Sequence, residues 1–239
     1  AATGEELWSQ SYTRELKDVF ALQEELAGAI VGELRGQLAG GETAAAVKAA
    51  VKGGTTNAEA YQQYLQGRYS FNRHAEKSTT AAVAFFHRAV ELDPSFALAW
   101  SGLARTHLWL CEFSTELERT GFDEHLALAR TALARALALE TNLPDGLLAR
   151  AEIELNFDFD WKGAAATLRT ARALAPADPA LATQAGNLAL AHGDITQAIE
   201  LYRQATQLKP EFFKAHATWS QCLLGLAQQA TDPQQRRAH

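Results

Sequence analysis

The chain has 239 residues, of which 47% are hydrophobic and 21% charged, proportions typical of a globular protein with a buried core. Its 22 lysines and arginines and 28 acidic residues give a formal net charge of −6, with both signs interspersed and no basic face, which argues against direct nucleic-acid binding. No apolar run of about 18 residues predicts a membrane span within this chain, and the two distant cysteines, Cys111 and Cys222, predict neither a disulfide framework nor a zinc ribbon.

The first residues, AATGEELWSQ, have neither the basic nor the apolar region of a signal peptide, and methionine is absent from the whole chain. We therefore expect a fragment of a longer product. The cysteine usage suits a reducing compartment, so a cytoplasmic location is expected. A periplasmic location is the alternative if a membrane segment lies upstream.

Residues 1–39 predict the tail of an upstream domain. The segment LWSQSY, residues 7–12, alternates apolar and polar residues as a half-buried strand does. An apolar residue at every fourth position then predicts a helix over about residues 16–38; these residues are Leu22, Leu26, Ile30, Leu34 and Leu38. A lone strand is not stable, so a second copy could supply its neighbours, and a homodimer through residues 7–38 is one expected assembly. Residues 40–57, which contain two Gly pairs, are interpreted as a linker.

From residue 58 onward the sequence repeats. Pro176 and Pro210 are 34 positions apart, which is the period of the tetratricopeptide repeat. In the unit that ends at Pro210, Gly186 allows two helices to approach closely and Tyr202 is expected to fill the space between helix pairs. The pattern predicts helical hairpins at 58–94, 97–141, 144–176 and 179–210, an insertion in the second hairpin, and a terminal half-repeat at 213–228. The predicted fold is therefore all-α, a superhelix of tetratricopeptide repeats preceded by a short strand and helix.

The stretch FDFDWKGA, residues 157–164, places two acids on alternate positions between aromatic residues. A metal loop would need further oxygen ligands nearby, and none is evident. We favour a turn between two helices, with Asp160 as the N-cap of the second. Asp194 is expected to cap the helix that begins in GDITQA in the same way.

The motifs of common enzyme families are absent, because no phosphate-binding loop, dinucleotide fingerprint, nucleophile elbow or H-E-x-x-H sequence occurs. We predict no catalytic residue, no cofactor and no metal site. His107 and Cys111 have a spacing that two metal ligands could use, but a zinc site needs at least three protein ligands, so helix packing is favoured. Trp109 lies near the insertion and could face a ligand.

Equivalent first-helix positions in the repeats carry polar residues, namely Arg105, Glu152, Asn187 and Gln221. Stacking would bring them into one column on the concave face. Together with nearby Ser101, Trp109, Thr183 and Lys214, they are candidates for a groove that binds a protein or peptide segment. The alternative is a solvated face with an Arg105–Glu152 pair, which contributes little in water.

Three stretches, GEELWSQSYTRELKDVFALQEELAGAIVGEL, NAEAYQQYLQGRYSFNR and FDFDWKGA, resemble a bacterial regulator family. In that family a TolB-like domain precedes tetratricopeptide repeats, commonly behind a class III adenylate/guanylate cyclase, a winged-helix domain or a kinase. The resemblance implies that residues 1–39 are the tail of the TolB-like domain. It also implies a non-catalytic protein–protein interaction scaffold within a larger signalling or regulatory protein; the alternative is an oligomerisation module of a cyclase or transcriptional regulator. No catalytic or DNA-reading residue of these fusions maps onto the sequence.

Overall fold

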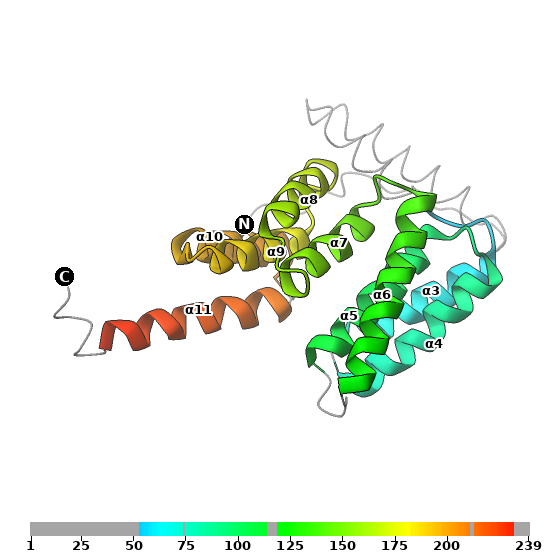
Figure 1. Ribbon diagram of the computed structural model, residues 1–239, viewed down its shortest axis with the longest axis horizontal. Coiled ribbons are helices and arrows are strands. Elements are labelled where there is room, and N and C mark those ends of the chain that lie inside the picture. Colours follow the sequence, from blue (N-terminus) through cyan, green and yellow to red (C-terminus); the bar gives the residue numbers. More distant parts are fainter. Residues whose placement is uncertain (1–52, 74, 114–118, 211–212, 232–239) are drawn as a thin grey trace, which may run out of the picture.

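The computed structural model describes residues 53–73, 75–113, 119–210 and 213–231 (Figure 1). The predicted strand at residues 7–12 and the predicted helix at about 16–38 lie outside these residues, as does most of the predicted linker.

The described residues form nine α-helices and no strand, which confirms the predicted all-α fold for this part of the chain. The helices are α3 (Ala58–Phe71), α4 (Glu76–Leu92), α5 (Ala97–Phe113), α6 (Arg119–Leu139), α7 (Pro144–Asn156), α8 (Trp161–Leu174), α9 (Pro179–Ala191), α10 (Ile195–Leu208) and α11 (Phe213–Thr231).

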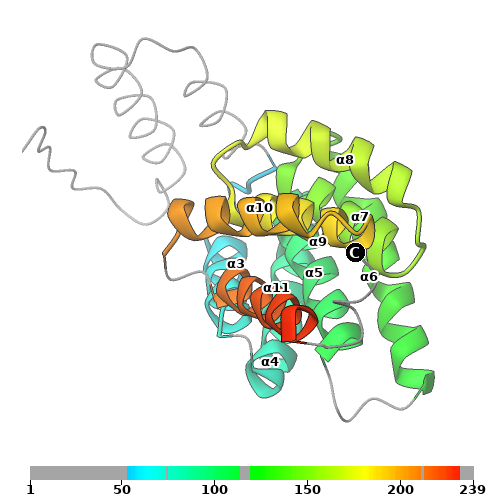
Figure 2. The same cartoon turned by 90° about the vertical axis from the view of Figure 1, so that its left-hand side faces the viewer.

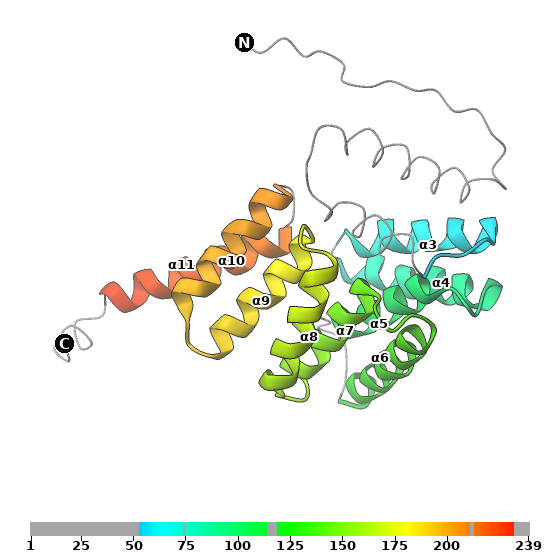
Figure 3. The ribbon, with the colours of Figure 1, turned by 90° about the horizontal axis from the view of Figure 1, so that it is seen from above.

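The helices stack as hairpins in chain order, from α3–α4 at one end to α9–α10 and the single helix α11 at the other (Figure 3). Each helix packs against the next along the chain. The first helices of successive hairpins, α3, α5, α7 and α9, also contact one another in series, and α9 contacts α11. Figure 2 views the array from its α10–α11 end. The first helices therefore form one shared layer through the array.

Side-chain caps fix where several helices begin. The Asp160 carboxylate accepts a hydrogen bond from the backbone N–H of Gly163, and Asp194 accepts one from the backbone N–H of Gln197. Both caps were predicted from the sequence and are confirmed. Such caps satisfy N–H groups that the first turn of a helix leaves without partners. In the same way, Asn57 caps α3 and Asp178 caps α9.

The stretch FDFDWKGA forms a turn between α7 and α8. Phe157 is the C-cap of α7, and Phe159 has a positive φ of 54°. The side chain of Asp158 forms an ion pair with Arg130 of α6, while Asp160 starts α8. No group of three or more potential metal ligands occurs in the described part of the chain. The observed geometry confirms the turn-and-cap interpretation.

Glycines let aromatic rings pack directly on helix backbones. A Cβ added at Gly186 would lie 2.5 Å from Cε1 of Tyr202, and one added at Gly102 would lie 2.5 Å from Cε1 of Phe86. A Cβ added at Gly67 would also meet Phe86, 2.8 Å from its Cδ1 and Cε1 atoms. Both rings are fully buried. The close approach predicted at Gly186 is confirmed, and the structure identifies the Tyr202 ring as the group that packs there; Phe86 makes the same kind of contact in an earlier hairpin.

In the second hairpin α5 has 17 residues and α6 has 21. Between these two helices, His107 Nδ1 lies 2.9 Å from Nδ1 of His125, and the Cys111 thiol contacts the carbonyl oxygen of Phe122 at 3.6 Å. His107 is buried, as the packing interpretation predicts. Burial and the neighbouring His125 and His87 lower the pKa of His107 to about 4, so its imidazole is neutral at pH 7.

The segment before α3 is hydrogen-bonded to the end of α4 and the start of α5. The carbonyl oxygen of Gly53 accepts a hydrogen bond from the backbone N–H of Leu98 at 3.0 Å. The hydroxyl of Thr55 bonds Asp93, and the Asn57 amide donates to the carbonyl oxygen of Leu92 at 3.1 Å. Residues 53–57 therefore bridge the start of the first hairpin to the start of the second.

Candidate binding cleft between the first helices

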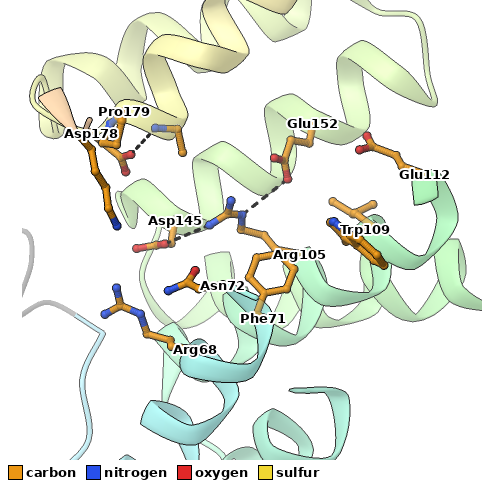
Figure 4. A pocket seen from close by; sticks show the side chains of 13 residues that line it. Arg68, Phe71, Asn72, Arg105, Trp109, Glu112, Asp145, Glu152, Asp178 and Pro179 are labelled. Atoms are coloured by element: carbon orange, nitrogen blue, oxygen red, sulfur yellow. Dashed lines mark hydrogen bonds and ion pairs between the residues drawn. The ribbon is translucent and has the colours of Figure 1, made fainter. Parts of the chain in front are cut away.

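A cleft of about 210 Å³ opens between α3, α5, α7 and the start of α9 (Figure 4). Each of these helices is the first of its hairpin, so the cleft lies on the shared layer described above. Thirteen residues line it: Arg68, Phe71, Asn72, Arg105, Leu108, Trp109, Glu112, Asp145, Glu152, Asp178, Pro179, Ala180 and Lys209.

Helical spacing brings the central side chains together. Arg105 and Trp109 are four residues apart on α5 and therefore share one face of that helix. Asp145 lies in the first turn of α7, and Glu152 follows seven residues later on the same helix. Asp178 is positioned by its role as the N-cap of α9, where it accepts a hydrogen bond from the backbone N–H of Ala180 at 2.8 Å. Figure 4 shows these side chains converging on the cleft from three helices.

Arg105 is the electrostatic centre of the cleft. Its Nε lies 3.7 Å from Oε2 of Glu152, and its NH1 lies 3.7 Å from Oδ1 of Asp145. These separations are ion-pair distances beyond the range of a direct hydrogen bond. Burial alone would lower the pKa of Arg105, but the surrounding acidic groups, led by Glu152 and Asp145, outweigh it and raise that pKa. The guanidinium also lies 5.6 Å from the ring centroid of Phe71. One partly buried cation thus links α5 to α7.

The carboxylates of the cleft outnumber its cations. Burial and the charge of Asp145 raise the pKa of Asp178, although the N-cap hydrogen bond and Arg105 oppose that rise. The acidic lining residues are Glu112, Asp145, Glu152 and Asp178, and the basic ones are Arg68, Arg105 and Lys209. The cleft is therefore charged with both signs and has aromatic walls at Phe71 and Trp109.

Three of the predicted groove residues meet in this cleft, namely Arg105, Trp109 and Glu152. Two others lie in the interior instead. Ser101 is fully buried, with its hydroxyl oxygen close to Gly146, and Thr183 is buried with its hydroxyl bonded to the carbonyl oxygen of Pro179 at 2.8 Å. These small polar residues occupy helix-packing positions.

Two of the remaining predicted residues, Asn187 and Gln221, lie outside the cleft. Asn187 bonds within its own hairpin, donating to Gln184 and accepting from the Tyr202 hydroxyl at 2.8 Å. Gln221 is exposed on α11. The side chain of Lys214 falls outside the part of the chain that the structure describes. The column therefore converges at its α5 and α7 members, and the Arg105–Glu152 pair of the alternative interpretation forms within the cleft.

Sequence reasoning missed the helix-start residues of the cleft. Asp145 follows Pro144, which occupies the first turn of α7, and Asp178 precedes Pro179 at the start of α9. The available signal was this acid beside a helix-initiating proline. It identifies the helix start but not the direction in which the carboxylate points. Arg68 and Phe71, at the end of α3, carried no comparable signal.

None of the helices in the described residues is long and apolar enough to cross a membrane. No family model matches the chain. A protein of Rhizobium meliloti (strain 1021) described as "Putative adenylate cyclase 3" is 33% identical over 102 residues, which cover 43% of this chain. The chain matches only 17% of the length of that relative.

Two solved structures resemble the chain. A thermophilic TPR protein of Thermus thermophilus, TTC0263, is 16% identical with a TM-score of 0.49, covering 87% of this chain and 95% of its own. The APC/C hetero-tetramer Cut9–Hcn1 contains a chain that is 17% identical with a TM-score of 0.49, covering 88% of this chain and 42% of its own. The described part of the chain is an all-α array of stacked helical hairpins with aromatic rings packed on glycines.

Proposed function

We propose that this chain is a non-catalytic scaffold that binds a segment of another protein in the cleft between its first helices. The observation that carries the proposal is the convergence of Arg105, Trp109 and Glu152 on one cleft formed by successive hairpins. Stacked repeats offer extended surfaces of this kind for partner chains.

The size and chemistry of the cleft suit side chains of a partner segment. Pockets that enclose small molecules usually measure about 300–1,000 Å³, whereas this one measures about 210 Å³. Phe71 and Trp109 offer apolar contact, and the surrounding charges would select polar side chains on either side. A segment with an apolar anchor flanked by charged residues is the expected ligand.

We further infer a regulatory role within a larger bacterial signalling protein. The support is the 33% identity with the adenylate cyclase relative, of which the matched region is a small part. No catalytic motif occurs in this chain, so any cyclase or other effector activity would belong to another region of the longer protein. The repeats would then bind a partner and report that binding to the effector.

Selection from a random linear peptide library against the full chain tests cleft binding. Enriched peptides should bind with micromolar or better dissociation constants and lose at least tenfold in affinity with Trp109→Ala or Lys209→Ala. Arg135→Ala, an exposed change on α6 outside the cleft, is the control and should leave affinity unchanged. Peptides that bind all four chains equally would refute the cleft as the site.

A second candidate function is self-association. Leu223 and Leu224 of α11 are 46% and 61% exposed, and residues 7–38 carry the predicted apolar stripe. Light scattering of the full chain and of Leu224→Glu distinguishes the two functions. Oligomerisation is favoured if the chain is a dimer that Leu224→Glu dissociates and if no peptide binds in a way that depends on the cleft. A monomer that binds peptides favours the scaffold.

A further inference from the structure

A second depression, which shares no lining residue with the cleft, lies between α8 and α10 above α9 and measures about 510 Å³. Its floor consists of Leu168 of α8, Leu188 of α9, Leu201 of α10 and three alanines. Arg169 and Arg172 of α8 stand on its rim. We call this depression the α8–α10 groove.

The rim arginines have no acidic partner among the residues that the structure describes. Among the other described arginines, an ion pair with a carboxylate is formed by Arg88, Arg105, Arg130, Arg150 and Arg203 but not by Arg68, Arg73 and Arg135. Arg169 and Arg172 form no ion pair with any described residue. Asp194, the carboxylate among the lining residues of the groove, is held as the N-cap of α10 by the backbone N–H of Gln197. The apolar floor of the groove therefore lies beside two arginines, Arg169 and Arg172, whose charge no described carboxylate neutralises.

We propose that the α8–α10 groove binds an acidic amphipathic helix of a partner protein. The three leucines would bury apolar side chains spaced along one face of that helix, which is the usual mode of helix-in-groove recognition. The alanines, which have short side chains, allow a helix axis to approach to about 8–10 Å. Carboxylates beside the apolar face would pair with Arg169 and Arg172, adding orientation and a faster association rate.

The dimensions of the groove set the length of the contact. Its α8 wall runs from Ala165 to Arg172, which at 1.5 Å per residue is about 12 Å, or roughly two helical turns. The contact therefore suits apolar residues at positions i, i+3 or i+4, and i+7 of the ligand, with acids beside them. The apolar floor favours such a helix over a nucleic acid, whose phosphates would pair with the two arginines and make no use of the leucines.

A display library of helical peptides, selected against the full chain, tests this proposal separately from cleft binding. Enriched peptides should combine the apolar spacing with acidic residues, and Arg169→Glu/Arg172→Glu should weaken them at least tenfold. Trp109→Ala, which changes only the cleft, should leave their affinity unchanged, so the two sites are scored independently. The matched control is Arg135→Glu, an exposed arginine on α6. Circular dichroism should show unchanged helix content for every variant.

Charge exchange provides the decisive result. Replacing the acids of an enriched peptide with lysines should abolish its binding to the unmodified chain and restore its binding to Arg169→Glu/Arg172→Glu. Enriched peptides without acids, or affinities that the double substitution leaves unchanged, would overturn the proposal. So would preferential binding of a labelled single-stranded DNA that depends on the same arginines, because that result would assign the groove to nucleic acid.

Discussion

Gly186→Ala isolates the contact between a helix backbone and the Tyr202 ring. The added methyl carbon would lie 2.5 Å from Cε1 and 2.8 Å from Cδ1 of that ring, closer than any ordinary carbon–carbon contact. Tyr202 is fully buried, and its hydroxyl donates a hydrogen bond to Asn187. The ring therefore cannot move away without disturbing that bond or the surrounding core.

Two opposing terms determine the expected magnitude. Overpacking of a buried site typically destabilises by about 1–3 kcal/mol, whereas replacing a helical glycine with alanine gains about 1 kcal/mol in helix propensity. The substitution should therefore lower the free energy of unfolding by up to about 2 kcal/mol. Gly102→Ala, which meets Phe86 in the same way, should act in the same direction.

Urea unfolding followed by circular dichroism measures this change, and Tyr202→Leu supplies the control. In a double-mutant cycle, Gly186→Ala should be less destabilising when Leu replaces the ring, with a coupling of at least about 0.5 kcal/mol. An unfolding midpoint for Gly186→Ala at or above that of the unmodified chain would refute the reasoning, because helix propensity would then outweigh the steric contact. Additive effects in the cycle would show that Tyr202 is not the obstructing group.

Three further predictions concern charge and capping. Asp160→Ala should lower stability by about 1 kcal/mol in thermal or urea unfolding, because it removes the N-cap of α8; an unchanged midpoint would contradict that role. Arg105→Ala should destabilise by about 2–3 kcal/mol, because it leaves the buried Glu152 carboxylate without its cation, and Glu152→Gln in the same chain should recover part of the loss. His107 has a pKa of about 4 in the folded chain against about 6.5 when unfolded, so the unfolded chain binds more protons between these values. The contribution of neutral His107 to the free energy of unfolding is therefore complete above pH 6.5. It decreases as the pH falls toward 4, by at most about 3 kcal/mol. His107→Phe should flatten the dependence of the urea midpoint on pH in that range; an equally steep dependence would assign it to other groups.

The repeats could be predicted because their signals are local and recur. The proline period, the small residues opposite Tyr202 and the acids at Asp160 and Asp194 each act within one hairpin, so the sequence pattern reports them directly. The cleft depends on how hairpins rotate against one another, and no single repeat specifies that rotation. The column of equivalent positions therefore indicated Arg105 and Glu152 correctly as neighbours but also included Asn187, which bonds to Tyr202 instead.

Side-chain direction explains the other differences. Ser101 and Thr183 lie near the column in sequence, but their short side chains fit against neighbouring helices and become buried. The arginines on the rim of the α8–α10 groove could not be identified from the sequence for a different reason. Arg169 and Arg172 resemble any surface arginines in the sequence, and only the placement of carboxylates in the fold shows that no described residue pairs with them.

The hydrogen bonds at residues 53–57 have a mechanical consequence. Gly53 is bonded to Leu98 and Asn57 to Leu92, so whatever precedes Gly53 is attached at the junction of two hairpins rather than to the free end of one. Torque applied from the N-terminal side would be shared between α3 and α5 at once. A change in the tilt between those two helices would therefore displace Gly53, the point at which the preceding chain is attached.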